Sequence, residues 1–144
     1  MILPVVAYGH PVLKHVAEEI DQNYPGLQQL IADMFETMYH SEGVGLAAPQ
    51  INKSIRLFVI DADPFHENYP EAKGFKKVFI NPEIVEVSDE TWTFNEGCLS
   101  LPDMHEDVVR PSKITINYLD ENFVEHEEEY DGIKARVIQH EYDH

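Results

Sequence analysis

The sequence has a single cysteine, Cys98, among its 144 residues. A disulfide within the chain is therefore excluded, and this thiol is either a small buried group or a reactive or metal-binding one. Long apolar runs are also lacking, so no stretch predicts a membrane-spanning helix. The first residues, Met1 to Pro4, lack the basic start and apolar core of a signal peptide. We therefore expect a cytoplasmic protein that does not contact membrane.

Basic residues are scarce. Ten Lys and Arg stand against 27 Asp and Glu, which gives a formal net charge of −17. A field of this sign repels nucleic acid and anionic membrane, so we expect no direct binding to either. Hydrophobic residues make up 43% of the chain and aromatic residues 10%, a composition that argues against disorder. A length of 144 residues predicts one domain, 1–144, with a core of its own.

Periodicity divides the chain into a few elements. An amphipathic helix is predicted between Pro25 and Gly43, where apolar residues recur with helical spacing at Leu27, Leu30, Ile31, Met34, Phe35 and Met38. A buried strand is predicted over 55–60, and one or two strands over 77–87 around Asn81-Pro82. Alternating residues predict a hairpin over 114–130, whose second strand carries an acidic edge. A final helix follows.

The last five residues, His140-Glu141-Tyr142-Asp143-His144, match H-E-x-x-H. On a helix, positions i and i+4 lie about 40° apart and roughly 6 Å along the axis, so both imidazoles can reach one metal ion. Glu141 is then placed beside that metal, where a base for a water molecule is needed. The motif also occurs by chance, and a catalytic metal site needs a third protein ligand.

Two further segments bear on this site. Cys98 lies in a glycine-containing loop and is the one thiol that could complete the ligand set, although an isolated cysteine is more often a small core residue. The segment 43–50, Gly-Val-Gly-Leu-Ala-Ala-Pro-Gln, cannot comfortably continue the preceding helix. It is either a helix end with a linker or the wall of a site for an extended peptide, with Gln50 as an amide donor.

Together the three segments resemble the signature motifs of peptide deformylases, G-x-G-L-A-A-x-Q, E-G-C-L-S and Q-H-E-x-D-H, in the same order. The opening residues Tyr8 to Leu13 resemble the start of that family, so the resemblance covers nearly the whole chain. It implies a hydrolase that removes the formyl group from the N-terminal formylmethionine of new polypeptides, releasing formate. It also implies an α+β fold in which antiparallel sheets pack around a C-terminal metal-binding helix.

The resemblance also implies the roles of individual residues. Cys98, His140 and His144 would bind one divalent metal ion, which in this family is preferably ferrous iron, with zinc or nickel as substitutes. Glu141 would be the general base and acid. The Gln50 side-chain amide and the Leu99 backbone N–H would donate to the oxygen on which negative charge develops.

The methionine side chain of the substrate needs an apolar pocket, for which we expect Val44, Ile133 and Val137. The alternative for Ile133 and Val137 is plain core packing. The peptide after the methionine is expected to lie as a strand beside Gly43–Gly45. Because the substrate is a newly made chain, transient proximity to the ribosome is also expected.

Two other functions are compatible with the same residues. One is a metallopeptidase of the H-E-x-x-H kind, and the other is a deformylase-like protein that binds metal or peptide without turnover. Chains of this family usually continue the last helix beyond the second histidine, whereas this sequence ends on it. We therefore expect the last helical turn to be well ordered only when the metal is bound. We also expect that ending at the second histidine can reduce activity.

Overall fold

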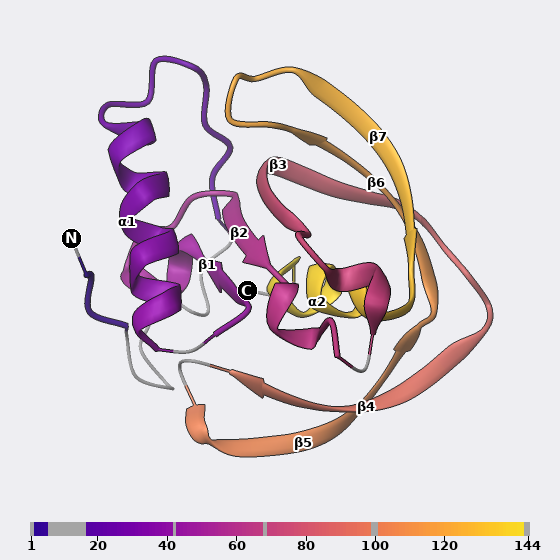
Figure 1. The fold of residues 1–144 in the computed structure, drawn as a ribbon. Coiled ribbons are helices and arrows are strands. Elements are labelled where there is room, and N and C mark those ends of the chain that lie inside the picture. The colour runs from indigo at the N-terminus through magenta and orange to yellow at the C-terminus, as the bar shows by residue number, and fades with distance from the viewer. Residues whose placement is uncertain (1, 6–16, 42, 68, 99–100, 143–144) are drawn as a thin grey trace.

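The computed structural model describes residues 2–5, 17–41, 43–67, 69–98 and 101–142, with the side chains of 94–98 and 101–107 outside this description (Figure 1). Its two α-helices are α1, Leu27–His40, and α2, Gly132–Tyr142. Its strands are β1 Gly45–Ala47, β2 Leu57–Asp61, β3 Lys76–Val87, β4 Thr91–Cys98, β5 Leu101–Pro111, β6 Lys113–Leu119 and β7 Glu125–Asp131. The α+β class with antiparallel sheets and a C-terminal helix is thereby confirmed.

The larger sheet has the strand order β1-β2-β3-β6-β7, and each neighbouring pair is antiparallel. β7 is an outer strand of this sheet, and the alternate residues Glu125, Glu127 and Glu129 are exposed on it. This confirms the predicted acidic edge, which discourages pairing with another chain. β1 is the outer strand at the opposite side of the sheet.

The break predicted at Asn81-Pro82 does not divide the strand in two. β3 continues through it, and the register with β6 shifts between Ile80 and Glu83. Asn81 has a φ of 49°, a left-handed conformation that asparagine tolerates better than most residues. Its side chain both accepts from Ile20 N–H and donates to Ile20 C=O, at 3.0 and 2.7 Å. The irregularity is thus held in place by the preceding segment.

The five-stranded sheet separates two apolar clusters because side chains alternate along its strands. In β2, Leu57 and Val59 pack on the α1 side, and Phe58 and Ile60 pack on the α2 side. This two-sided burial explains why the strand reads as an unbroken apolar run. The helix α1 begins at Leu27 rather than at Pro25, because Gly26 adopts a left-handed conformation with a φ of 68°.

The strands β4 and β5 form a separate two-stranded sheet, in which Trp92 lies opposite Arg110 and Cys98 lies opposite Leu101. In Figure 1 this hairpin curves around one side of α2, and the larger sheet curves around the other. The last helix is therefore enclosed by β-structure. Neither described helix is long and apolar enough to span a membrane.

Candidate active site at the end of α2

The last turn of α2 holds the described part of the H-E-x-x-H motif. His140 is half-buried, and Glu141 is only 5% exposed. The helix forms here because Ile133, Val137 and Ile138 supply a buried apolar stripe that packs against the sheet. The helix thus gives a carboxylate and an adjacent imidazole on one rigid element, as the sequence predicted.

Strand β1 passes directly against Glu141. A Cβ atom added to Gly45 would lie 2.7 Å from Glu141 Oε2 and 2.8 Å from its Cδ and Cγ atoms. Ordinary Cβ contacts are longer than these distances, so any larger residue at position 45 would force the carboxylate to move. Gly45 is therefore required by the position of Glu141 rather than by its own backbone conformation, since its φ is not in the left-handed region.

Gln50 follows β1 in a short 3-10 helix, η2, Ala48–Ile51. Its side chain is 1% exposed, and Oε1 accepts a hydrogen bond from Ala47 N–H at 2.9 Å. This contact fixes which end of the amide is the acceptor, so Nε2 is presented as a donor on the other side. Pro49 fits the start of η2, because a residue in the first turn of a helix does not need its backbone N–H as a donor.

The segment before β1 is held from two sides. Gly43 N–H donates to Met38 C=O of α1 at 2.9 Å, and Val44 C=O accepts from Asp61 N–H of β2 at 2.9 Å. Within the described chain, β2 is the only strand that pairs with β1. As expected, the segment 43–50 does not continue α1: it contains the short strand β1 followed by the 3-10 helix η2. The other edge of β1 carries no paired strand among the described residues.

Some predicted residues lie partly or wholly beyond this description. The backbone of Cys98 ends β4, but its side chain, Leu99 and His144 lie outside the described residues. Among the side chains that are described, no three of His, Cys, Asp or Glu lie together as a metal site. Of the three predicted ligands, the imidazole of His140 is thus the one that the structure places.

The three residues expected to bind the methionine side chain belong to one apolar cluster. Ile133 is fully buried, Val137 is 5% exposed, and the half-buried Val44 packs against the same group. Phe58, Ile60 and Ile138 also belong to this cluster. The structure therefore brings the three residues together, within the core between α2 and the sheet.

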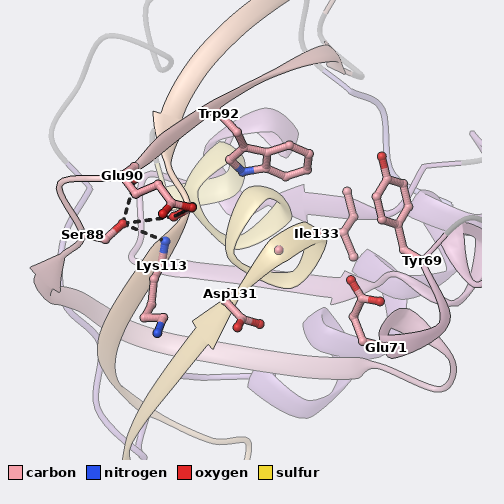
Figure 2. A pocket seen from close by; sticks show the side chains of 10 residues that line it. Tyr69, Glu71, Ser88, Glu90, Trp92, Lys113, Asp131 and Ile133 are labelled. Atoms are coloured by element: carbon pink, nitrogen blue, oxygen red, sulfur yellow. Dashed lines mark hydrogen bonds between the residues drawn. The ribbon is translucent and has the colours of Figure 1, made fainter.

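A cavity of about 720 Å³ lies at the other end of α2 (Figure 2). It is lined by Ile133 and Trp92, and by polar residues that include Glu71, Glu90 and Asp131. The acidic lining is unsuited to a methionine side chain, and we do not assign this cavity to the active site.

Two buried polar residues of α2 were given no role in the sequence analysis, although Gln139 opens the Q-H-E-x-D-H motif. Arg136 is 1% exposed and Gln139 is 5% exposed, and both donate hydrogen bonds to carbonyls of the β4–β5 hairpin. The available signal was an arginine at a core-facing position of an amphipathic helix. Such a position predicts a buried, hydrogen-bonded charge, because an unpaired one would be too unfavourable.

A cluster of residues with shifted pKa values lies in the larger sheet. In the larger sheet, Tyr118 and Tyr130 both donate to Glu128 Oε1, the second at 2.6 Å. Burial, and then the hydrogen bond to Glu128, raise the pKa of each tyrosine. Burial, the largest single effect, raises the pKa of Glu128, but the two tyrosine hydroxyls and the nearby Lys77 and His126 together lower it overall. This cluster joins β6 to β7 and is structural.

Comparison with known proteins supports the same family. The sequence model of the polypeptide deformylase family matches residues 2–144. The peptide deformylase of Flavobacterium psychrophilum is 56% identical over 151 residues, covering all of this chain and 78% of that protein.

Solved structures of peptide deformylases have a similar fold. The crystal structure of the Thermotoga maritima peptide deformylase has a TM-score of 0.89 at 38% identity, covering 99% of this chain and 90% of that one. A Met-Ala-Ser-bound peptide deformylase from Acinetobacter baumannii has a TM-score of 0.91 at 37% identity, covering 99% and 92%. The chain therefore belongs to the polypeptide deformylase family, metal-dependent hydrolases that remove the N-formyl group from nascent peptides.

Proposed function

We propose that Cys98, His140 and His144 hold the metal ion of this deformylase, and that Glu141 moves the protons of the reaction. The observation that carries the proposal is the burial of the Glu141 carboxylate beside His140, in a space that only a glycine at position 45 leaves open. A carboxylate enclosed next to a metal ligand is suited to proton transfer with water excluded.

The donor set fits a divalent transition metal. One thiolate and two imidazoles are ligands that ferrous iron, zinc and nickel all accept, and three protein ligands leave a position for water or substrate. We propose ferrous iron as the native metal, with zinc or nickel as alternatives, because this is the preference that the family resemblance implies. When bound, the metal lowers the pKa of a water molecule and polarises the formyl oxygen.

The chain's own groups then account for the remaining steps. Glu141 accepts a proton from the water that attacks the formyl carbon. Negative charge grows on the formyl oxygen, and the Gln50 Nε2 amide and the Leu99 N–H are proposed to donate to it. As the carbon–nitrogen bond breaks, Glu141 returns the proton to the amine nitrogen. The products are formate and a peptide with a free amino terminus.

The substrate is proposed to bind as an added strand. The outer edge of β1 offers backbone groups to an extended peptide, and Gly43–Gly45 carry no bulky side chain except Val44. Val44, Ile133 and Val137 are proposed to contact the methionine side chain. A methionyl tripeptide, Met-Ala-Ser, is bound in the similar Acinetobacter baumannii structure, which supports this class of ligand.

We place the working enzyme in the cytoplasm, with transient proximity to the ribosome, because its substrates are nascent chains. The net charge of −17 argues against binding to ribosomal RNA itself. Proximity would then arise through the emerging peptide.

The test is formate release from a formyl-Met-Ala-Ser peptide by anaerobically prepared, metal-loaded protein, with and without a strong chelator. We expect stoichiometric formate and free Met-Ala-Ser, abolished by the chelator and restored by ferrous iron. Cleavage of internal peptide bonds without formate would instead identify a metallopeptidase. Tight binding of methionyl peptide without formate release would identify a binding protein.

A further inference from the structure

The β4–β5 hairpin forms no strand ladder with the larger sheet in the described chain. Its base is fixed by two backbone hydrogen bonds, from Ser112 N–H to Glu90 C=O at 2.8 Å and from Ser88 N–H to Lys113 C=O at 2.9 Å. Figure 2 shows Ser88 at the centre of this base. The position of the rest of the hairpin relative to α2 must therefore be set by other contacts.

Arg136 supplies such contacts to both strands of the hairpin. Its Nη1 donates to Val108 C=O of β5 at 2.9 Å, and its Nη2 donates to Trp92 C=O of β4. The guanidinium carbon also lies 4.8 Å from the centroid of the Trp92 ring, in a cation–π arrangement. Trp92 lies beside α2 in Figure 2. One side chain of α2 thus binds two carbonyls and a ring of the hairpin.

Gln139 adds a third hairpin carbonyl. Its Nε2 donates to Pro111 C=O, the last residue of β5, at 2.9 Å, and to Ala135 C=O within the helix at 3.1 Å. Pro111 lies opposite Thr91, at the base of the hairpin. Arg136 therefore binds the hairpin further from its base than Gln139 and the backbone hydrogen bonds do.

Burying an arginine in a core is unfavourable in free energy, because its charge is removed from water. Apolar side chains of similar volume often stabilise a fold as well as a buried charge does. What the planar guanidinium adds is direction, because its fixed fork of donors binds two acceptors in one geometry, which a lysine cannot reproduce. The two carbonyls to which Arg136 donates in the described chain both belong to the hairpin, one on each strand.

We propose that Arg136 is a positioning residue that sets the β4–β5 hairpin, and with it Cys98, relative to the histidine ligands of α2. Arg136 precedes His140 by four residues, about 6 Å along the helix and on the same side. Cys98 ends the strand that Arg136 holds through Trp92. The proposal rests on the proposed function, in which Cys98 and His140 bind one metal.

The test uses Co²⁺ as the probe. Metal-free wild type, Arg136→Met, Arg136→Lys, Lys134→Met and Cys98→Ser are titrated with Co²⁺ without oxygen. Affinity is measured by chelator competition, and Cys98 ligation is measured by the thiolate-to-cobalt charge-transfer absorption. Circular dichroism reports folding. Lys134→Met is the matched control, because Lys134 lies on the same helix but contacts Phe75, 4.8 Å from its ring centroid, instead of the hairpin.

We expect Arg136→Met to bind Co²⁺ roughly 10- to 100-fold more weakly, the scale for lost support of metal ligands, with a weaker charge-transfer band. Arg136→Lys should be intermediate, and Lys134→Met should equal wild type. A folded Arg136→Met with wild-type affinity and absorption would overturn the proposal. If Arg136→Met fails to fold, wild-type behaviour of Arg136→Lys would overturn it.

The Cys98→Ser variant separates this proposal from the one on which it rests. It should lose the charge-transfer band completely. Persistence of the band in that variant would refute the assignment of Cys98 as a ligand. Loss of the band in Cys98→Ser together with wild-type spectra for both Arg136 variants would refute only the positioning role.

Discussion

Gly45 and Glu141 are in such close contact that no Cβ atom fits between them: one added to Gly45 would lie 2.7 Å from Glu141 Oε2. The two residues are far apart in the sequence, one on β1 and the other on α2. The first and last sequence motifs are thereby joined at one point. This contact is the structural reason for treating them as parts of one site.

Gly45→Ala should displace the Glu141 carboxylate while leaving the metal ligands in place. Because a misplaced acid–base group loses most of its effect, we expect kcat to fall by roughly 10²-fold, with one metal ion retained. Formate release and metal content measured on the same sample check this. Normal turnover would mean that the carboxylate can shift without consequence.

The Glu141→Ala background provides the control for this variant. With the carboxylate removed, the alanine at position 45 has room, so adding Gly45→Ala to Glu141→Ala should change neither kcat nor stability further. A double-mutant cycle in kcat and in the free energy of unfolding measures this coupling. Additive losses would show that Gly45→Ala acts on something other than Glu141.

Gln50→Glu should separate the two ends of the Gln50 amide. The variant keeps an oxygen for Ala47 N–H, which Oε1 accepts at 2.9 Å, but it replaces the Nε2 donor by a second oxygen. We expect kcat to fall on the order of 10²-fold, as for other single oxyanion donors. We also expect some loss of stability, because the new carboxyl group is buried. Gln50→Ala, which loses both the donor and the Ala47 contact, should be equally inactive. A change confined to KM would show that Gln50 only holds substrate.

Val44→Asp should weaken selection of methionine, because it puts a charge into an apolar cluster. The ratio of kcat/KM for formyl-Met over formyl-Ala peptides should fall by about tenfold or more. The variant must be folded and must retain its metal for the comparison to hold. An unchanged ratio would remove Val44 from the substrate pocket.

The elements and the chemistry of the site differ in how well the sequence predicts them. The helix α1 and the strand β2 are predictable because their apolar residues repeat with the period of one local structure. The pairing of Gly45 with Glu141 is not predictable from spacing, since it depends on how β1 packs against a helix some 90 residues later. The motifs name both residues, but only the packing explains why position 45 must be glycine.

Arg136 illustrates a second limit. Its position on the core-facing side of α2 is visible from the helical period, whereas its partners are backbone carbonyls. A carbonyl is present at every residue, so the sequence carries no signal for which two are bound. The same holds for the bulge at Asn81, where a turn-forming pair predicts a break but not that the strand continues.

Glu128 should contribute to stability in a pH-dependent way. Its pKa is lowered below the usual 4.5, because the tyrosine hydrogen bonds and the nearby Lys77 and His126 together outweigh burial. The unfolded chain therefore binds the proton at higher pH than the folded one. The stabilisation is present above about pH 4.5 and is lost as the pH falls through the lower, folded pKa.

Glu128→Gln should therefore reduce the free energy of unfolding by roughly 1 kcal/mol at neutral pH, a modest figure because the side chain is 36% exposed. The difference from wild type should shrink well below pH 4.5. Urea denaturation of metal-free protein at both pH values checks this, since metal loss in acid is then excluded. A gap that is constant with pH would contradict the assignment.

In the proposed site, Cys98 binds the metal and Glu141 moves protons without binding it. Metal content and formate release, measured on the same anaerobic preparations of Cys98→Ser and Glu141→Ala, test this proposal most directly. We predict that Cys98→Ser loses both tightly held metal and activity, since a hydroxyl stays protonated where a thiol becomes a thiolate. Glu141→Ala should keep one equivalent of metal and lose at least roughly 10²-fold in turnover. A full equivalent of metal in Cys98→Ser, or near-normal turnover in Glu141→Ala, would contradict it.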